Sequence, residues 1–323
     1  MPALLRMAAA VAFVMSSWLS AGVAAAEDYP SRPIHLIAGF GPGSSGDLVS
    51  RAIAAPMSVT LGQQLVAESR TGAGGNLATQ FVARAPADGY ALLNGSNTSV
   101  TNAVLQGLPF DFTKDFAPIG LIGSMPNILV VNPSLGVSTV AELIALAKSK
   151  PDQIFYGSAG VGSSPHLSAE LFNMMAGTKL AHVPYQGSAQ ATTDLLAGRI
   201  SVMFAPASTV AAHIESGALK ALASTQLKRA SVAPNLPTLS EAGLTGFETG
   251  IWMGLLAPGG TPPEVIGKLS RALNGALASQ EVVAGLNRIG MDTTAGTPEE
   301  FAAFIVAETK KWSTVALAAG LKK

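Results

Sequence analysis

The stretch that decides the fold is YGSAGVGSSPHLSAELF, residues 156–172, together with HVPYQGSAQATTDLLAGRISVMF, residues 182–204. Each segment runs from a short apolar strand through a turn of Gly, Ser and Pro into an amphipathic helix. Such a turn leaves unpaired backbone N–H groups at the positive end of the helix, beside the hydroxyls of Ser163, Ser164 and Ser188. The arrangement suits a small anion, and a carboxylate in particular.

The same alternation of strand and helix extends outward along the chain. Residues 34–40, 65–68 and 90–96 predict strands, whereas residues 47–60 and 76–83 predict helices. Near the C-terminus, Thr/Pro starts followed by acidic residues predict further helices that serve packing. This rhythm predicts an α/β fold of mainly parallel sheets flanked by helices.

Composition excludes several classes of protein. The 323 residues include twenty basic and twenty acidic side chains, so no overall field favours nucleic acid or an anionic membrane. Cysteine is absent, which excludes disulfides, thiolate metal sites, Cys nucleophiles and a lipid-modified N-terminal Cys. The four histidines are scattered without metal-ligand spacing, so we expect no metal and no cofactor. The length is sufficient for two domains.

The N-terminus predicts a signal peptide over residues 1–26. Arg6 supplies a positive charge, residues 7–19 are apolar, and Ala24–Ala26 form a small-residue cleavage site before Glu27. The apolar run is shorter than the ~20 residues that span a bilayer, although an N-terminal anchor helix is the alternative. We expect a periplasmic protein whose mature chain starts at Glu27.

These residues resemble the periplasmic solute-binding proteins of tripartite tricarboxylate transporters, the Bug family. The resemblance rests on YGSAGVGSSPHL, HVPYQGSA and DLLAGRISVMF in series, with LPTLSEAGLTGFE and W-x-G-L-x-A-P downstream, and covers residues 29–320. It implies a two-lobed Venus-flytrap fold, with residues 27–125 plus 251–323 as lobe 1 and residues 126–250 as lobe 2. It also implies a ligand in the cleft between the lobes, a membrane permease partner and, in some members, a sensor kinase.

The candidate ligand-binding residues lie on loops where strands end and helices begin. They are Phe40, Gly43, Ser44, Ser45, Asp47, Ser96, Asn97, Ala159, Gly160, Ser163, Ser164, His166, Tyr185, Gln186, Gly187, Phe204 and Ala205. The loops around them contain no Lys or Arg, so backbone N–H groups, hydroxyls, amides and water must hold a carboxylate. This favours a mono- or dicarboxylate over a phosphate. Dicarboxylates, tricarboxylates, amino acids and aromatic acids all remain open.

A competing motif is GPGSSG, residues 41–46, which matches the dinucleotide fingerprint G-x-G-x-x-G after a strand and before a helix. Export, the negative charge of Asp47 and the stiffness of Pro42 all oppose a pyrophosphate there. The same turn is similar to the P-G-G-x-x-D loop of the Bug family, with Ser44 in place of the second glycine.

Several residues have two interpretations. Asp47 is a helix N-cap or first-turn acid, or else a counter-charge for a ligand amine. His166 contacts the ligand, or bonds nearby backbone in the first helical turn. His182 is best explained as a packed, hydrogen-bonded structural residue. Tyr185 and Phe40 form apolar walls of the site or ordinary core.

The sequence offers little for catalysis. There is no G-x-S-x-G elbow, no paired acids and no activated nucleophile, although an exported hydrolase is the alternative from another class. We therefore expect a monomeric, non-enzymatic binding protein that captures a small carboxylate between two lobes and delivers it to a permease. A ligand sensor that feeds a membrane kinase is the alternative among binding proteins.

Overall fold

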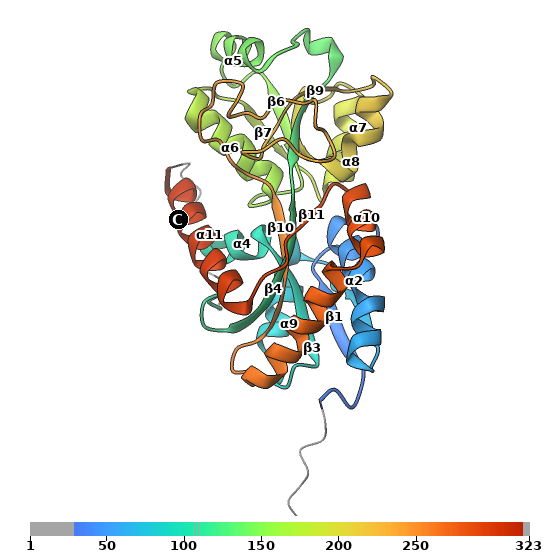
Figure 1. The fold of residues 1–323 in the computed structure, drawn as a ribbon. Coiled ribbons are helices and arrows are strands. Elements are labelled where there is room, and N and C mark those ends of the chain that lie inside the picture. Colours follow the sequence, from blue (N-terminus) through green and yellow to red (C-terminus); the bar gives the residue numbers. More distant parts are fainter. Residues whose placement is uncertain (1–28, 107, 109, 319–323) are drawn as a thin grey trace, which may run out of the picture. The chain divides into compact units, whose positions relative to one another are not determined.

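The computed structural model describes residues 29–106, 108 and 110–318. Arg32 begins a compact unit that contains two β-sheets and the helices around them (Figure 1). The expected signal peptide lies outside the described residues. Among the described helices, none has both the length and the apolar character that crossing a membrane requires.

The first sheet has six strands in the order β11-β4-β10-β3-β1-β2. Its strands are β1 (Ile34–Ala38), β2 (Leu65–Ser69), β3 (Ala91–Ser96), β4 (Phe116–Met125), β10 (Ile251–Pro258) and β11 (Asp292–Thr293). Strand β1 pairs in parallel with β2 and β3, whereas β10 runs antiparallel to β3 and β4. Strand β11 is antiparallel to β4.

The second sheet has five strands in the order β7-β6-β8-β5-β9. They are β5 (Asn127–Val131), β6 (Phe155–Ser158), β7 (Ala181–Pro184), β8 (Val202–Pro206) and β9 (Lys220–Ser224). Strand β6 is parallel to β7 and β8, while β5 is antiparallel to β8 and β9.

Both sheets are therefore mixed, and the expectation of mainly parallel sheets is corrected on this point. The antiparallel pairs involve strands near the connections between the sheets. Strand β5 carries the chain into the second sheet and β10 brings it back into the first. Each of these strands runs against the neighbours whose carboxyl ends face the other sheet. The expectation of a two-sheet α/β fold with flanking helices is confirmed.

Helices cover both sheets. Around the first sheet lie α2 (Ser45–Leu61), α3 (Asn76–Ala83), α4 (Asn97–Gln106), α9 (Pro263–Leu277), α10 (Gln280–Arg288) and α11 (Pro298–Ala318). Around the second lie α5 (Val140–Ser149) and α6 (Ser164–Ala176) on one face, with α7 (Ser188–Leu196) and α8 (Ala207–Glu215) on the other (Figure 1). The short 3-10 turns are η1 (Ala73–Gly75) and η2 (Pro133–Leu135).

Strand β5 shows why this sheet is covered on both faces. Leu129 and Val131 belong to the core cluster with α5 and α6, whereas Ile128 and Val130 belong to the cluster with α7 and α8. Successive side chains of a strand point to opposite faces, so the continuous apolar run ILVV at residues 128–131 requires a layer of helices on each side.

Two segments join the sheets, and they are hydrogen-bonded to each other. Pro126 alone separates β4 from β5, while residues 225–250 connect β9 to β10. The Thr225 backbone N–H donates to the Asn127 carbonyl at 3.0 Å, and the Asn127 backbone N–H donates to Thr225 Oγ1 at 3.0 Å. The Thr249 backbone N–H donates to the Thr225 carbonyl at 2.8 Å. The two connections are therefore held side by side by hydrogen bonds among Asn127, Thr225 and Thr249, and we call them the paired band.

Helix α11 contributes to the cores of both sheets. Phe301 and Ile305 pack in the cluster of the first sheet, whereas Trp312 and Val315 pack in that of the second. Between them, the buried Glu308 accepts hydrogen bonds from Trp252 Nε1 at 2.9 Å and Trp312 Nε1 at 2.8 Å. Helix α11 therefore packs against the cores of both sheets.

Candidate functional site

A cavity of about 400 Å³ is lined by loops from both sheets. Its walls are made where strands end and helices begin: β1 leads into α2, β3 into α4, β6 into α6, β7 into α7 and β8 into α8. Strand β10 begins beside the cavity and contributes Ile251 and Met253. The cavity thus lies where open α/β sheets bind ligands, at the carboxyl ends of strands.

The structure brings together many of the residues that the sequence predicted for the site. Those that line the cavity are Phe40, Gly43, Ser44, Ser45, Ser96, Ala159, Ser163, Ser164, Gln186 and Gly187. Those outside its lining are Asp47, Asn97, Gly160, His166, Tyr185, Phe204 and Ala205.

Charged groups are absent from the residues that line the cavity, which include no Asp, Glu, Lys, Arg or His. Helix N-termini supply the electrostatic potential instead. The caps or first-turn residues of α2, α4, α6, α7 and α8 all line the cavity, so five positive helix ends converge on it. Backbone N–H groups in these first turns have no carbonyl partner within the helix, which suits an anion.

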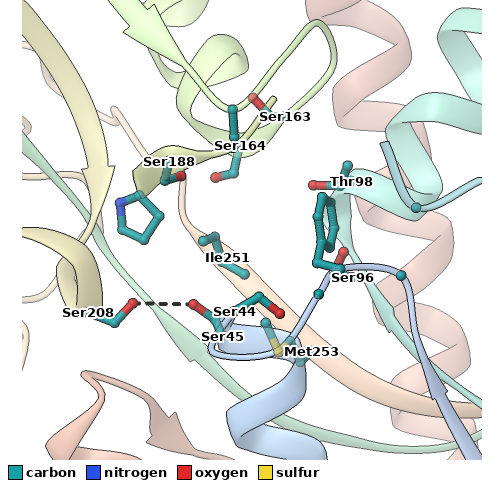
Figure 2. A pocket seen from close by; sticks show the side chains of 18 of the residues that line it. Ser44, Ser45, Ser96, Thr98, Ser163, Ser164, Ser188, Ser208, Ile251 and Met253 are labelled. Carbon is teal, nitrogen blue, oxygen red and sulfur yellow. Dashed lines mark hydrogen bonds between the residues drawn. The ribbon is translucent and has the colours of Figure 1, made fainter. Parts of the chain in front are cut away.

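The hydroxyls differ in what they can still donate (Figure 2). Ser163 already donates its proton to the Gly160 carbonyl at 2.6 Å, and Ser164 donates to the Gly250 carbonyl at 2.9 Å. Ser45 and Ser208 share one hydrogen bond at 3.2 Å between the two sides of the cavity. At Ser163 and Ser164, a carboxylate would therefore meet backbone groups, because both hydroxyl protons are already donated within the protein.

Other cavity hydroxyls remain available. The structure shows no hydrogen bond from the hydroxyls of Ser96, Thr98 or Ser188 to any described residue. Ser44 Oγ accepts the Asp47 backbone N–H at 3.2 Å and thereby caps α2, while its proton is uncommitted. These groups can donate to a ligand oxygen without breaking an existing contact.

Asp47 holds the loop and does not face the cavity. Its side chain is 7% exposed, with Oδ2 accepting the Gly43 backbone N–H at 3.0 Å and Oδ1 accepting Arg51 Nε at 2.9 Å. Of its two interpretations, the geometry matches the first-turn acid, although Ser44 is the N-cap. Asn97 is similarly committed, because its Nδ2 donates to the Gly250 carbonyl at 3.1 Å.

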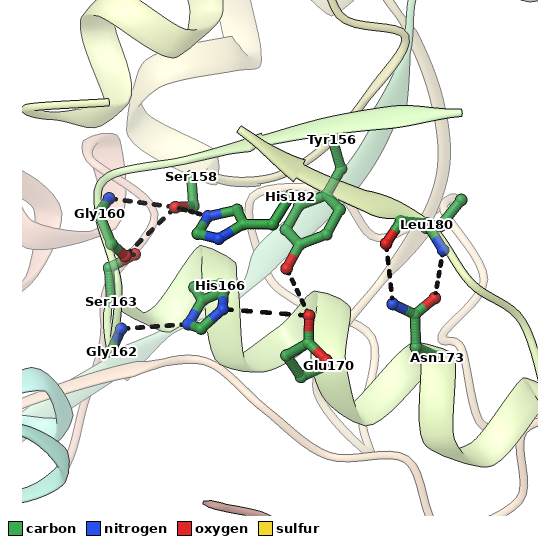
Figure 3. A network of polar contacts seen from close by, with 10 residues as sticks. All are labelled: Tyr156, Ser158, Gly160, Gly162, Ser163, His166, Glu170, Asn173, Leu180 and His182. Carbon is green, nitrogen blue, oxygen red and sulfur yellow. Dashed lines mark hydrogen bonds and ion pairs between the residues drawn. The ribbon is translucent and has the colours of Figure 1, made fainter. Parts of the chain in front are cut away.

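His166 lies beneath the loop of residues 159–163, in a stack of three rings (Figure 3). Its ring centroid lies 4.2 Å from that of His182, which in turn lies 4.9 Å from that of Tyr156. His166 Nδ1 accepts the Gly162 backbone N–H at 3.1 Å, which leaves the proton on Nε2, 4.0 Å from Glu170 Oε1.

Burial shifts the pKa values in this stack. Burial first, and then the neighbouring His182, lower the pKa of His166 to about 3, while burial lowers that of His182 to about 4. His182 Nε2 lies 2.6 Å from Ser158 Oγ, and Tyr156 donates to Glu170 Oε1 at 2.6 Å. Burial and Glu170 raise the pKa of Tyr156. Two neutral histidines therefore support the loop that lines the cavity.

The remaining predicted residues lie behind the cavity wall. Phe204 and Ala205 are fully buried and pack on opposite faces of the second sheet, because their side chains alternate along β8. Tyr185 donates to Asp194 Oδ2 at 2.9 Å, and burial followed by this contact raises its pKa to about 12. Gly160 uses its carbonyl to accept from Ser163.

Sequence reasoning missed the contribution of β10. Ile251 and Met253 line the cavity from the strand that follows the second connection, together with Leu48 of α2 and Leu93 of β3. The W-x-G-L-x-A-P motif marked this strand, but an apolar strand carries no local sign that one end borders a cavity. Within the described residues, no group of three or more His, Asp or Glu side chains could hold a metal ion.

Two α/β sheets joined by a paired band, with an uncharged cavity at their strand ends, define a two-lobed solute-binding protein. The family model described as "Tripartite tricarboxylate transporter family receptor" matches residues 49–321, and the chain belongs to this family.

Similar proteins span nearly the whole chain. Protein BugT of Bordetella pertussis is 36% identical over 309 residues, which cover 94% of this chain and 95% of BugT. Rpa4515 of R. palustris, solved with adipate, is 36% identical with a TM-score of 0.82, covering 91% of this chain and 99% of that one. MatC (Rpa3494) of Rhodopseudomonas palustris, solved with malate, is 31% identical with a TM-score of 0.81, covering 89% and 99%.

Proposed function

We propose that this chain is a periplasmic solute-binding protein that captures a small carboxylate in the cavity and delivers it to a tripartite tricarboxylate-type permease. The observation that carries the proposal is the convergence of five helix N-termini on a cavity without charged side chains. Unpaired N–H groups and helix dipoles favour an anion, and the apolar walls favour one with a carbon body. The family and the carboxylates of two solved relatives support this.

The lobes we propose are residues 27–125 plus 251–323 and residues 126–250. The change of sheet at Pro126 and again between β9 and β10 supports these boundaries. A ligand that contacts both sides of the cavity would stabilise the closed arrangement, since it binds that state more tightly than an open one. The Ser45–Ser208 contact at 3.2 Å is the kind of contact that opening would break.

Delivery follows from closure in this proposal. The permease would recognise a surface composed from both lobes, which exists only when the ligand holds them together. The protein itself would perform no reaction. Secretion through the signal peptide of residues 1–26 would place the protein where such a permease collects its ligand.

Calorimetric titration of the protein purified from the periplasm tests the proposal. The protein would first be freed of endogenous ligand by reversible unfolding, and then titrated with adipate, malate, citrate and benzoate. Saturable binding of at least one acid without turnover is expected. The absence of binding by every carboxylate, or release of a chemically altered product, would contradict the proposal.

A pair of tryptophan variants places the site. A Cβ at Gly187 would meet no heavy atom within 4 Å and Gly187 lines the cavity, so we expect Gly187→Trp to be tolerated locally and to obstruct the site. Gly275, exposed in α9, has equally open space and is the matched control. Binding should be lost in Gly187→Trp and retained in Gly275→Trp. Retention in both would show that the ligand binds elsewhere.

A further inference from the structure

His166 is buried behind the cavity wall, and its side chain bonds the loop that forms this part of the wall (Figure 3). The residue is 2% exposed and does not line the cavity. Its Nδ1 accepts the Gly162 backbone N–H at 3.1 Å. Ala159 and Ser163, which lie on either side of Gly162 in the loop of residues 159–163, do line the cavity. The His166 ring therefore reaches the cavity through one backbone hydrogen bond.

Gly162 occupies a tight place between the two sheets. Its φ is +80°, and a Cβ there would come 2.5 Å from Asn102 Oδ1 and 3.3 Å from Leu105 Cδ1, both on α4. Its carbonyl lies 3.2 Å from Thr101 Oγ1, also on α4. The Gly162 peptide is thus held between a helix of the first sheet and the His166 ring on α6 of the second.

The conformation of this loop determines which N–H groups of α6 stay free. Ser163 is the N-cap of α6, but its hydroxyl makes no capping bond and donates instead to the Gly160 carbonyl at 2.6 Å. A capping serine accepts from the second or third helical residue. Here the second is Pro165, which has no N–H, and the third is His166. The described residues provide no hydrogen-bond partner for the His166 backbone N–H, so this donor is left for a ligand.

The bond to Gly162 requires a neutral His166 with its proton on Nε2, because Nδ1 accepts only in that form. Glu170 Oε1 lies 4.0 Å from Nε2 and favours a proton there, while the same oxygen accepts from the Tyr156 hydroxyl at 2.6 Å. The His182 ring stacks on His166 at 4.2 Å. Burial first, and then His182, lower the pKa of His166 to about 3, so Nδ1 remains an acceptor at neutral pH.

A second histidine holds the other end of the same loop. His182 Nε2 lies 2.6 Å from Ser158 Oγ, and this oxygen also accepts the Gly160 backbone N–H at 3.1 Å. A change at His166 alone therefore leaves the start of the loop attached to the second sheet. This makes it possible to alter the Gly162 end by itself.

We propose that His166 is a positioning residue for ligand binding. Its Nδ1 fixes the Gly162 peptide, so that the Ser163 hydroxyl is kept from capping α6 and the first-turn N–H groups of α6 are left for the ligand. The inference rests on the proposed carboxylate-binding function and gives a part in it to a side chain outside the cavity lining. Because the ligand and the His166–Gly162 bond favour the same loop conformation, each should stabilise the other by the same factor.

A matched pair of variants tests the role of Nδ1. His166→Asn and His166→Leu have the same branching at Cγ and both lose the ring stack, but only Asn offers an acceptor in place of Nδ1. Each variant would be titrated calorimetrically with whichever of adipate, malate, citrate and benzoate binds the wild type most tightly. His166→Leu should bind about tenfold or more weakly than the wild type, whereas His166→Asn should stay within about threefold.

Two outcomes of this titration would overturn the inference. An equal loss of affinity in both variants would show that the ring stack matters and the acceptor does not. Full affinity in both would show that His166 does not position the site. His213→Leu, at the end of α8 and outside the stack, is the control and should bind as the wild type does.

Amide hydrogen exchange tests the coupling in the unchanged protein. Saturating ligand should slow exchange of the Gly162 N–H about tenfold or more, by the reciprocity of the coupling. The Gly136 N–H, which donates to the Pro133 carbonyl in a turn outside the cavity lining, should not change. An unchanged Gly162 rate would overturn the inference, even if His166→Leu does not fold. If no carboxylate binds the wild type, the proposed function fails and the inference with it, whereas the other outcomes overturn the inference alone.

Discussion

The stability of the protein should fall as the pH is lowered from 7.5 to 5.0, because His166 and His182 are held neutral in the fold. Burial and the adjacent His182 lower the pKa of His166 to about 3, and burial lowers that of His182 to about 4. The groups that face the stack are Glu170 and the Tyr156 hydroxyl. Lowering the pH therefore favours protonation of the two histidines that support the loop lining the cavity.

The sign follows from proton uptake. An unfolded histidine has a pKa near 6.5, so below this pH the unfolded chain binds protons that the folded chain does not. The stability that the two neutral histidines contribute to the fold is fully present above pH 6.5. It is lost as the pH falls toward their folded pKa values. Each proton corresponds to ~1.36 kcal/mol per pH unit, so between pH 6.5 and 5.0 each histidine removes about 2 kcal/mol of unfolding free energy.

Urea unfolding followed by circular dichroism, at pH 7.5, 6.5, 5.5 and 5.0, measures this loss. In His166→Gln the fall over the same interval should be smaller by about 2 kcal/mol, since one titrating group is gone. His213→Gln, in the last turn of α8 and outside the stack, is the control and should retain the wild-type pH dependence. Identical pH dependence in wild type and His166→Gln would refute the reasoning.

Three further changes have defined outcomes. The added methyl group of Gly254→Ala would overlap the buried Phe301 ring, so the free energy of unfolding measured in urea should fall by about 1–3 kcal/mol. An unchanged free energy of unfolding would show that the ring moves aside. Glu308→Ala leaves two indole N–H donors buried and should cost about 2–5 kcal/mol; a loss below 1 kcal/mol would show that the carboxylate does not tie α11 to both cores. Ser164→Ala should cost about 1–2 kcal/mol but change ligand affinity less than threefold, because its hydroxyl proton is already donated within the protein; calorimetry that shows lost binding would contradict this.

Much of the fold could be predicted because local patterns carry it. Residues 76–83 form the predicted helix, and the predicted strand at residues 34–40 appears as β1 over Ile34–Ala38. Apolar runs, glycine turns and helix starts are encoded within a few residues of each other. The direction of a strand is not encoded in nearby residues in this way, because it depends on which sheet the chain enters next. The sequence rhythm therefore predicted mainly parallel sheets where β5 and β10 run antiparallel to their neighbours.

The candidate site was predictable as loops and not as individual side-chain roles. Ser163 and Ser164 line the cavity, yet both hydroxyl protons are donated within the protein, to the carbonyls of Gly160 and Gly250. Whether a hydroxyl is available to a ligand depends on a partner that stands far away in the chain, such as Gly250. Leu48 and Met253 were missed for another reason, because the sequence around an apolar residue does not show whether the residue lies in the core or in a cavity wall.

By itself, the sequence determined the secondary-structure elements, the glycine- and serine-rich turns at the starts of helices, and the absence of charged side chains from those turns. These features depend on residue type and close spacing, which the chain carries in its order. Only the tertiary structure decided that five helix ends converge on one cavity and that Asp47 and His166 face away from it. It also decided that α11 packs against both sheets, because contacts between distant residues are set by the packing of the whole chain.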